Sequence, residues 1–492
     1  MAGFLHSCDK DFLETAPTNA ISDIDVFNSV DGAQTVIDGI LRDMRSFSLA
    51  GNHDEYGVKS LDLAAELGGE DIVIQTFHWM GWDYQLDNNL ATYRRVLFAW
   101  RMNYRIISNA NSILANIDDM PAADENFRQN VKAQALALRA YGYYNLALRF
   151  QHTYSLDPDA PGVPIYTEPT QEGKGRSSLS EVYDRIIDDL ETAITLFEEY
   201  PFSRRHISHL NLNVAHGIRA QVALEMEDWT NAANHALAAR DGMSLNSRSQ
   251  YASGFDNHTQ MNWIWGLEVN DEQSTIYRSW FAHMDMTIDG YAPFSPKVTF
   301  NLLYDKMQDG DIRKELIDPD ADFTTEDWWF GYSEDGDGNP IVDTRFSYAN
   351  LKFSAHGDKE FAADYVMMRP EEMLLIEAEA RARLGQDGQA QGLIGDLRAV
   401  RYDHTPDPVN LTGDALIEEI ILERRFELWG EGRRFFDIRR LQIPLDRTGG
   451  NHVPANALFL ELPANSNRFI YRIPISEIDA NDNIGPGDQN PI

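Results

Sequence analysis

Two separate stretches of this 492-residue chain place small and apolar residues at the same spacing. In the first, Ala220 is followed by Ala232, Ala236 and Ala239, and in the second, Ala378 is followed by Ala390, Ile394 and Leu397. The offsets are 12, 4 and 3 residues in both stretches. Because small side chains let helices approach closely, and because a turn signal interrupts each stretch at Asp228 or Gly385, each stretch predicts two packed helices.

This spacing matches the packing positions of a tetratricopeptide repeat. A further first helix is predicted from Leu138 to Leu146, with residues 178–197 as its partner across a loop rich in proline and glycine. Apolar periodicity also predicts helices within 26–47 and 91–117. The sequence therefore predicts an all-α fold, a tetratricopeptide-like scaffold of helical pairs with one large irregular, loop-rich insertion.

The insertion is expected between residues 243 and 365, which show few helical stripes and many Gly, Asp and aromatic residues. Long irregular segments in a helical scaffold are where binding residues concentrate. We divide the chain into an N-terminal tether (1–22), an N-terminal helical region (23–242), the aromatic-rich ligand-binding insertion (243–365) and a C-terminal region with a further helical pair (366–492).

The charge balance excludes one class of partner. The chain has 42 basic and 78 acidic residues, a net charge of −36. Such a surface repels phosphate backbones, so no nucleic-acid partner is expected. The single cysteine, Cys8, rules out an internal disulfide, and the sequence has no run of 18 or more apolar residues that would span a membrane.

No familiar catalytic motif is present. The sequence lacks GxSxG, HExxH and phosphate-binding loops, and its 13 histidines are not spaced as metal ligands. We therefore expect no enzymatic activity and no cofactor. The stretch Asp335–Asn339 (DGDGN) is similar to the start of a calcium loop, but Pro340 and Phe346 stand where such a loop requires Gly and Glu, so an acidic turn is favoured there over bound calcium.

Several motifs, in this order along the chain, resemble the SusD/RagB family of nutrient-binding surface lipoproteins of the Bacteroidetes. They are LHSC (Leu5–Cys8), similar to a lipobox, then RMNYRIISNANSIL, ALALRAYGYYNL, DYVMMRPEEMLLIEAEARARLG, ERRFELWGEGRRFFDIRR and YRIPISEIDANDNIGPGDQNP. The resemblance implies a lipid anchor on Cys8, a place on the outer-membrane surface, a SusC-like TonB-dependent transporter as partner, and capture of an oligosaccharide for import. Taken alone, LHSC is equally compatible with an ordinary thiol near the terminus.

The arginine-rich block 423–440 has three possible roles: a nucleic-acid stripe, a catalytic acid–arginine cluster or a structural clamp. Its acids are Glu423, Glu427, Glu431 and Asp437, and its arginines recur at helical spacing beside them. That spacing predicts mutual salt bridges three or four residues apart, with a break or close approach at Gly430 and Gly432. Because the resembled family carries this block whatever its ligand, we interpret it as a structural clamp.

Aromatic residues outside the helical pairs are the candidates for sugar binding. An aromatic face stacks on the apolar face of a pyranose, and nearby polar groups hydrogen-bond its hydroxyls. The candidates are Trp79, Trp82, Asp83, Tyr277, Trp280, Tyr291 and Trp328. We expect Trp82, Trp280 and Tyr291 to lie exposed on one face. Trp100, Trp263, Trp265 and Trp429 lie in apolar-periodic contexts that predict core positions.

Two other functions stay open at this stage. One is a peptide- or protein-binding surface on the same scaffold, as the resemblance to the RagB branch implies. The other is a protein–protein adaptor of tetratricopeptide type that carries no lipid. A glycan array separates sugar from peptide, and palmitate labelling of Cys8 separates the lipoprotein from the adaptor.

Overall fold

The computed structural model describes residues 26–46, 52–270, 277–288, 290–321, 347–355 and 362–492. Its longer helices are α2 (Val30–Met44), α3 (Val58–Gly68), α5 (Arg94–Asn116), α6 (Glu125–Phe150), α7 (Leu179–Glu199), α8 (Leu212–Glu225), α9 (Trp229–Ala239), α14 (Pro370–Arg383), α15 (Asp387–Ala399) and α16 (Gly413–Glu427). Its shorter helices are α4 (Gly81–Tyr84), α10 (Arg248–Tyr251), α11 (Trp280–Met284), α12 (Asn301–Tyr304), α13 (Ile312–Glu315), α17 (Arg434–Arg440), α18 (Pro454–Ala457) and α19 (Ile475–Ala480). Single 3-10 turns are η2 (Ile117–Asp119), η5 (Asn467–Phe469) and η6 (Pro486–Asp488).

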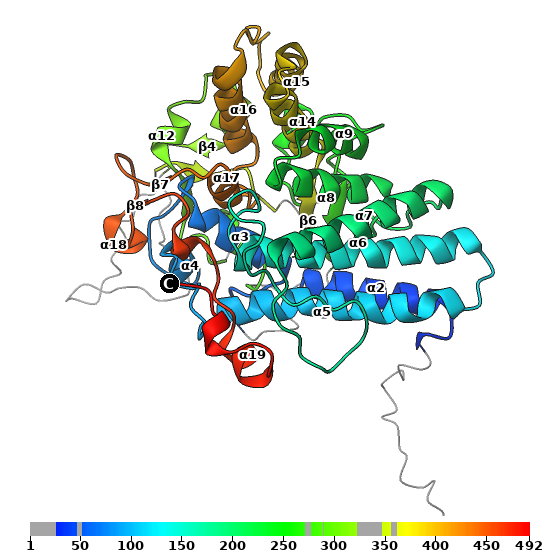
Figure 1. Ribbon diagram of the computed structural model, residues 1–492. Coiled ribbons are helices and arrows are strands. Elements are labelled where there is room, and N and C mark those ends of the chain that lie inside the picture. The colour runs from blue at the N-terminus through cyan, green and yellow to red at the C-terminus, as the bar shows by residue number, and fades with distance from the viewer. Residues whose placement is uncertain (1–25, 47–51, 271–276, 289, 322–346, 356–361) are drawn as a thin grey trace, which may run out of the picture.

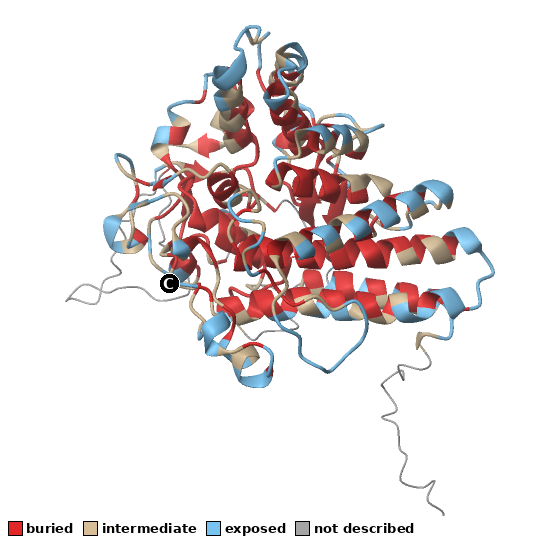
Figure 2. Cartoon of the chain, viewed as in Figure 1, coloured by how far each residue is buried: buried red, intermediate tan, exposed pale blue. Residues whose placement is uncertain are grey.

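The longest helices form one layer, with the C-terminal helices above one end of it. Figure 1 shows α2, α5, α6 and α7 alongside one another, whereas α14, α15 and α16 run across that direction. At the centre of the layer, α6 is buried at every residue from Ala133 to Phe150, which Figure 2 draws in red, whereas its outer end is tan and pale blue. A helix rich in alanine and aromatic residues around its whole circumference suits such a position. In the described residues, no helix is both long and apolar enough to cross a bilayer.

The predicted helical pairs are confirmed. Helix α8 packs against α9, α14 against α15 and α6 against α7. All eight spaced residues, Ala220, Ala232, Ala236, Ala239, Ala378, Ala390, Ile394 and Leu397, are completely buried. The first pair turns at Asp228, which caps α9 by accepting from the Asn231 N–H (3.2 Å), and the second turns at Gly385, whose φ of +73° suits glycine.

The chain between α9 and α14 is irregular, as predicted, because its described part forms only short helices and strands. The strands are β1 (Ile72–Ile74), β2 (Trp265–Leu267), β3 (Lys297–Thr299), β4 (Ile317–Asp318), β5 (Ala349–Asn350), β6 (Tyr365–Met368), β7 (Leu445–Asp446) and β8 (Glu461–Leu462). They form a four-stranded sheet in the order β1-β3-β5-β4 and two pairs, β2-β6 and β7-β8, all antiparallel. The all-α class is confirmed, and the four-stranded sheet joins the insertion to β1, which follows α3.

The block 423–440 is buried and acts as a clamp, as interpreted. Glu427 at the end of α16 is its centre: the carboxylate lies 2.6 Å from Arg369, 2.7 Å from Arg401 and 3.4 Å from Arg313. Glu431 pairs with the same Arg369 (2.8 Å) and with Lys352 (2.7 Å). Burial alone would raise the pKa of Glu427, but the three arginines hold it well below its ordinary value.

The predicted partners within the block were largely wrong. Among the described residues, Asp437 pairs with Arg440 (2.7 Å) three residues away and with Arg424 (2.9 Å). The other arginines reach elements far away in the chain: Arg425 to Asp71 (2.5 Å), Arg433 to Glu372 (2.9 Å) and Arg434 to Glu70 (2.5 Å). The reason is that the chain turns between α16 and α17, so the arginines face neighbouring elements and not their own helix.

Two glycines make that turn. Gly430 and Gly432 have φ of +79° and +82°, and a Cβ on Gly432 would lie 2.6 Å from the Asp62 Cβ. The turn presents backbone N–H groups of Gly430 (3.3 Å), Gly432 (2.8 Å) and Arg433 (3.0 Å) to the carboxylate of Glu66 in α3. The turn therefore connects α3 to the clamp, the buried ion cluster around Glu427 and Glu431.

Replacing Glu427 by Gln should lower the free energy of unfolding by about 3–5 kcal/mol, because Arg369, Arg401 and Arg313 would each lose one buried counter-charge. The measurement is urea denaturation at neutral pH. Glu418→Gln is the matched control, since Glu418 is exposed on the same helix and should change stability by less than about 0.5 kcal/mol. Equal stability of the two variants would contradict the clamp.

Stability should also fall in acid. Burial raises the pKa of Glu431, but Arg369 and Lys352 outweigh it and lower the pKa from 4.5 to about 2. A folded-state pKa below the unfolded value stabilises the fold above pH 4.5, and this contribution is lost as pH falls toward 2. The urea midpoint should fall as the pH is lowered from 7 to 2.5. In Glu431→Gln the slope of the urea midpoint against pH should be shallower. An unchanged slope in the variant would be evidence against the pairing.

Candidate ligand-binding site

Three loops meet beside the sheet formed by β1 and β3. The strand pairing sets the loop after β1 against the loop before β3, where Gln75 N–H donates to the Pro296 carbonyl (3.5 Å) and the Ser295 hydroxyl donates to the Thr76 carbonyl (2.7 Å). The loop before α3 joins them, because the His53 carbonyl accepts a hydrogen bond from the His283 ring in α11 (2.9 Å). Aromatic side chains from all three loops gather here.

Four rings stack into a column that runs from the core to the surface. Tyr56, His283, Tyr291 and His78 follow one another at centroid separations of 5.2, 4.9 and 5.5 Å, with interplanar angles of 21°, 22° and 30°. Tyr56 and His283 are completely buried, Tyr291 is half-buried and His78 is exposed. The column is therefore held firmly at its base and open at its outer end.

Trp79 stands beside this column. The His53 ring stacks on it at 5.5 Å and 18°, and the Tyr291 ring meets it at 6.2 Å and 75°. The Arg94 guanidinium lies 5.5 Å from the Trp79 ring centre and donates twice to the Asp54 carboxylate (2.7 and 2.8 Å). Such contacts hold the tryptophan in one orientation. We call His53, His78, Trp79, Tyr277 and Tyr291 the aromatic cluster, since Tyr277 also meets Tyr291 at 6.3 Å.

The two outer histidines are neutral donors and acceptors at neutral pH. Burial, and then the charge of Arg278, lowers the pKa of His53, and burial followed by Lys297 lowers that of His78. A neutral imidazole offers one N–H and one acceptor nitrogen. His53 shares a hydrogen bond with the Tyr291 hydroxyl. Flat rings with hydrogen-bonding edges suit the two faces of a sugar: apolar C–H groups and hydroxyls.

Three of the sequence-predicted residues come together in this cluster: Trp79, Tyr277 and Tyr291. Trp82 lies one turn further on, 41% exposed, with its ring against Phe77 (5.0 Å, 77°). Trp280 was expected to be exposed, and this is wrong. It is 2% exposed in α11, with the Lys59 ammonium 4.4 Å from its ring centre and Phe353 at 5.4 Å, because α11 packs onto α3.

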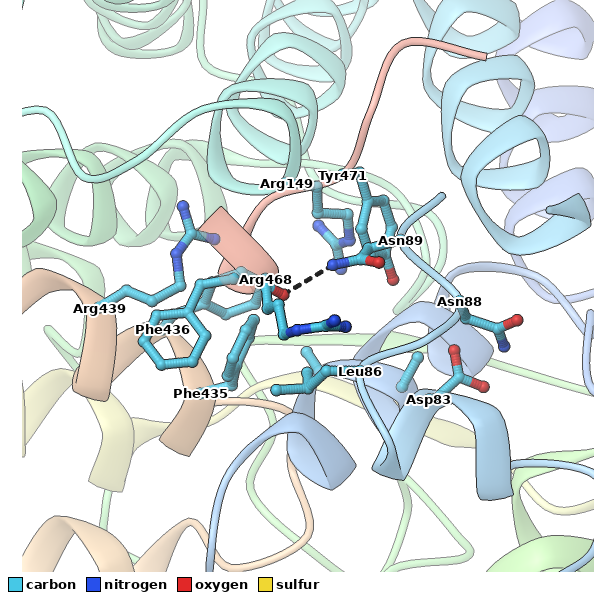
Figure 3. A pocket seen from close by; sticks show the side chains of 13 residues that line it. Asp83, Leu86, Asn88, Asn89, Arg149, Phe435, Phe436, Arg439, Arg468 and Tyr471 are labelled. Atoms are coloured by element: carbon cyan, nitrogen blue, oxygen red, sulfur yellow. Dashed lines mark hydrogen bonds between the residues drawn. The ribbon is translucent and has the colours of Figure 1, made fainter. Parts of the chain in front are cut away.

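Asp83 was also assigned to the ligand, but in the structure its carboxylate has a partner within the protein. Both of its carboxylate oxygens accept hydrogen bonds from Arg95 (2.9 and 3.0 Å), and the pair is buried. Figure 3 shows Asp83 at an internal cavity that also has Arg149, Phe435 and Arg439 in its lining. The cavity holds only about 20 Å³, room for water but not for a sugar ring.

Some predicted sites lie outside the described residues: Trp328, the lipid-anchor residue Cys8 and the stretch Asp335–Asn339. Within the residues that are described, no three His, Cys, Asp or Glu side chains are grouped as metal ligands. The four tryptophans predicted to be core are confirmed, since Trp100, Trp263, Trp265 and Trp429 are each at most 4% exposed.

A second hollow, of about 410 Å³, lies between α5, the loop after residue 164 and α19. Its volume is within the range of small-molecule sites. Several of its polar groups have partners within the protein: Trp100 donates to Glu477 (3.2 Å), Asn481 donates to the same carboxylate (2.9 Å) and Tyr104 donates to the Pro164 carbonyl (2.9 Å). We call this hollow the α5–α19 groove and use it as the alternative ligand site against which the aromatic cluster is tested.

Sequence reasoning missed His53, His78 and Lys297. The sequence contains one signal that could have identified His78, because this residue directly precedes the candidate Trp79 in a loop. Nothing local marks His53, which the contact with α11 brings to the cluster, or Lys297, which the pairing of β1 with β3 places beside the loop that carries His78 and Trp79.

Two family models match the chain. The model described as "Starch-binding associating with outer membrane" matches residues 11–224, and the model described as "SusD family" matches residues 250–492. The chain belongs to the SusD/RagB family. The resemblance seen in the motifs is thereby confirmed.

Relatives of this SusD/RagB chain align with it over most of its length. A SusD-like protein of Formosa agariphila is 25% identical over 439 residues, 76% of this chain and 77% of the relative. The crystal structure of a SusD-like carbohydrate binding protein from Bacteroides vulgatus is 29% identical, with a TM-score of 0.80 over 94% of this chain and 99% of that chain. The surface glycan-binding protein A from Bacteroides thetaiotaomicron, solved in complex with laminarihexaose, shares the fold with a TM-score of 0.68 at 15% identity, over 94% of this chain and 99% of that chain.

The burial of Trp280 and the exposure of Trp82 predict opposite effects of truncation. Trp280→Ala should lower the free energy of unfolding by about 3–5 kcal/mol, because it leaves a cavity between α3 and α11. Trp82→Ala should change it by less than about 0.5 kcal/mol. Chemical denaturation of the two variants beside the parent protein checks this, and a large loss for Trp82→Ala would contradict the placement.

Proposed function

We propose that this protein is a glycan-binding lipoprotein on the outer-membrane surface, which captures an oligosaccharide and delivers it to a SusC-like TonB-dependent transporter. The observation that carries the proposal is the column of stacked rings, buried at Tyr56 and open at His78, with Trp79 fixed beside it. A preorganised aromatic surface loses little freedom when a sugar stacks on it, which favours binding.

The comparisons support the same function. The matched model at 11–224 is described as starch-binding and associated with the outer membrane, and the Bacteroides vulgatus structure is that of a carbohydrate binding protein. The more distant structure that binds laminarihexaose shows that this fold can hold a glycan. A role in capture and delivery requires binding without cleavage, so we propose that the protein does not hydrolyse its ligand.

Truncating the aromatic cluster should weaken glycan binding without unfolding the protein. With a ligand taken from a glycan array, Trp79→Ala should raise the Kd at least tenfold, about 1.4 kcal/mol. Isothermal titration calorimetry measures the effect. Tyr166→Ala, in the α5–α19 groove, is the matched control and should leave the Kd unchanged. If Tyr166→Ala abolished binding and Trp79→Ala did not, the ligand site would be the groove.

Surface attachment depends on Cys8 in this proposal. Cys8→Ala in the native gene should move the protein out of the outer-membrane fraction, because a lipid chain is the anchor. Fractionation with antibody detection measures this. The unmodified protein should also co-purify with a TonB-dependent transporter from native membranes. A Cys8→Ala protein that stayed in the outer membrane would contradict the anchor.

A further inference from the structure

Lys297 is a buried lysine beside the loop that carries His78 and Trp79. It begins β3, pairs with Ile74 of β1 and is 1% exposed. Within the described residues its ammonium group has no hydrogen-bond or ion-pair partner, and burial lowers its pKa to about 7. A buried ammonium group without partners is costly for a fold.

Other buried lysines of this chain are compensated. The Lys352 ammonium donates to the carbonyls of Glu427 (3.0 Å) and Trp429 (2.8 Å) and pairs with Glu431 (2.7 Å). The Lys59 ammonium lies 3.2 Å from Asp62 and over the Trp280 ring. Lys297 differs from both because, within the described residues, its ammonium group has no such partner.

The position of Lys297 points to the ligand site. Lys297 pairs with Ile74, and the two residues before it, Ser295 and Pro296, hydrogen-bond to Thr76 and Gln75, so it lies beside the loop that carries His78 and Trp79. Its charge also lowers the pKa of His78 and His283, after the effect of burial. In the described residues, Arg278 also lowers the pKa of His53, which Asp54 raises, and His78 and Arg95 also lower the pKa of His283. Asp54 is already paired with Arg94 and Arg95. Although the chain has a net charge of −36, no carboxylate within the described residues is placed against the Lys297 ammonium group.

We propose that the ligand of the aromatic cluster is an anionic saccharide whose carboxylate or sulfate group pairs with Lys297. This inference rests on the proposed glycan-binding function and specifies its ligand class. Hydroxyls of a neutral sugar can hydrogen-bond an ammonium group but leave its charge uncompensated. An anion on the sugar supplies that charge, while the rings hold the pyranose faces.

Native affinity electrophoresis of the full chain tests this with matched polymers. The acidic probes are polygalacturonate and chondroitin sulfate, and their partners are the same polymers after carboxyl reduction or desulfation; laminarin and xylan complete the neutral set. Migration of the parent protein should be retarded by an acidic probe at least tenfold more strongly than by its neutralised partner. Loss on carboxyl reduction alone identifies a uronate, and loss on desulfation alone identifies a sulfate.

Lys297→Met should weaken retardation by the acidic probe at least tenfold and melt no earlier than the parent, since it removes an uncompensated buried charge. Lys306→Met, at an exposed lysine, controls for net charge and should bind as the parent does. Equal binding of neutral and acidic polymers would overturn the anionic ligand while leaving glycan binding intact. Undiminished acidic binding by Lys297→Met would overturn the role of Lys297. No retardation by any polymer would overturn the proposed function and this inference together.

Discussion

The carboxylate of Glu427 joins three arginines that lie far apart in the chain. It stands at the end of α16 and pairs with Arg369 before α14, Arg401 after α15 and Arg313 in α13. The backbone carbonyl of Glu427 accepts from Arg369 (2.7 Å) and from Lys352 (3.0 Å) after β5. An ion cluster of this kind contributes less through its net energy than through the penalty for leaving any member unpaired. That penalty makes one arrangement of the C-terminal helices and the insertion strongly preferred.

The clamp also positions the ligand site, although none of its members touches the aromatic cluster. Glu66 in α3 accepts three backbone N–H groups from the glycine turn, and Arg425 binds Asp71 at the end that leads into β1. The loop before α3 carries His53 and Tyr56, and the loop after β1 carries His78 and Trp79. Fixing α3 and β1 therefore fixes both loops, and the rings stack on a rigid base.

Local patterns predicted the scaffold well and the site only in part. The alanine offsets and turn residues lie within single helical hairpins, so α8 with α9 and α14 with α15 followed directly from the sequence. The burial of Trp280 and Asp83 was not predicted because it depends on partners elsewhere in the chain, Lys59 and Phe353 for one and Arg95 for the other. The stack of Tyr56, His283, Tyr291 and His78 joins residues more than 200 positions apart, and no periodicity reveals it.

A crystal structure of the protein with a bound acidic oligosaccharide tests this account most directly. The account predicts a pyranose ring against His78 and Trp79, with its carboxylate or sulfate oxygen within hydrogen-bond distance of the Lys297 Nζ, and an unchanged ring column beneath it. A ligand seated in the α5–α19 groove, or one at the aromatic cluster whose charged group points away from Lys297, would contradict it.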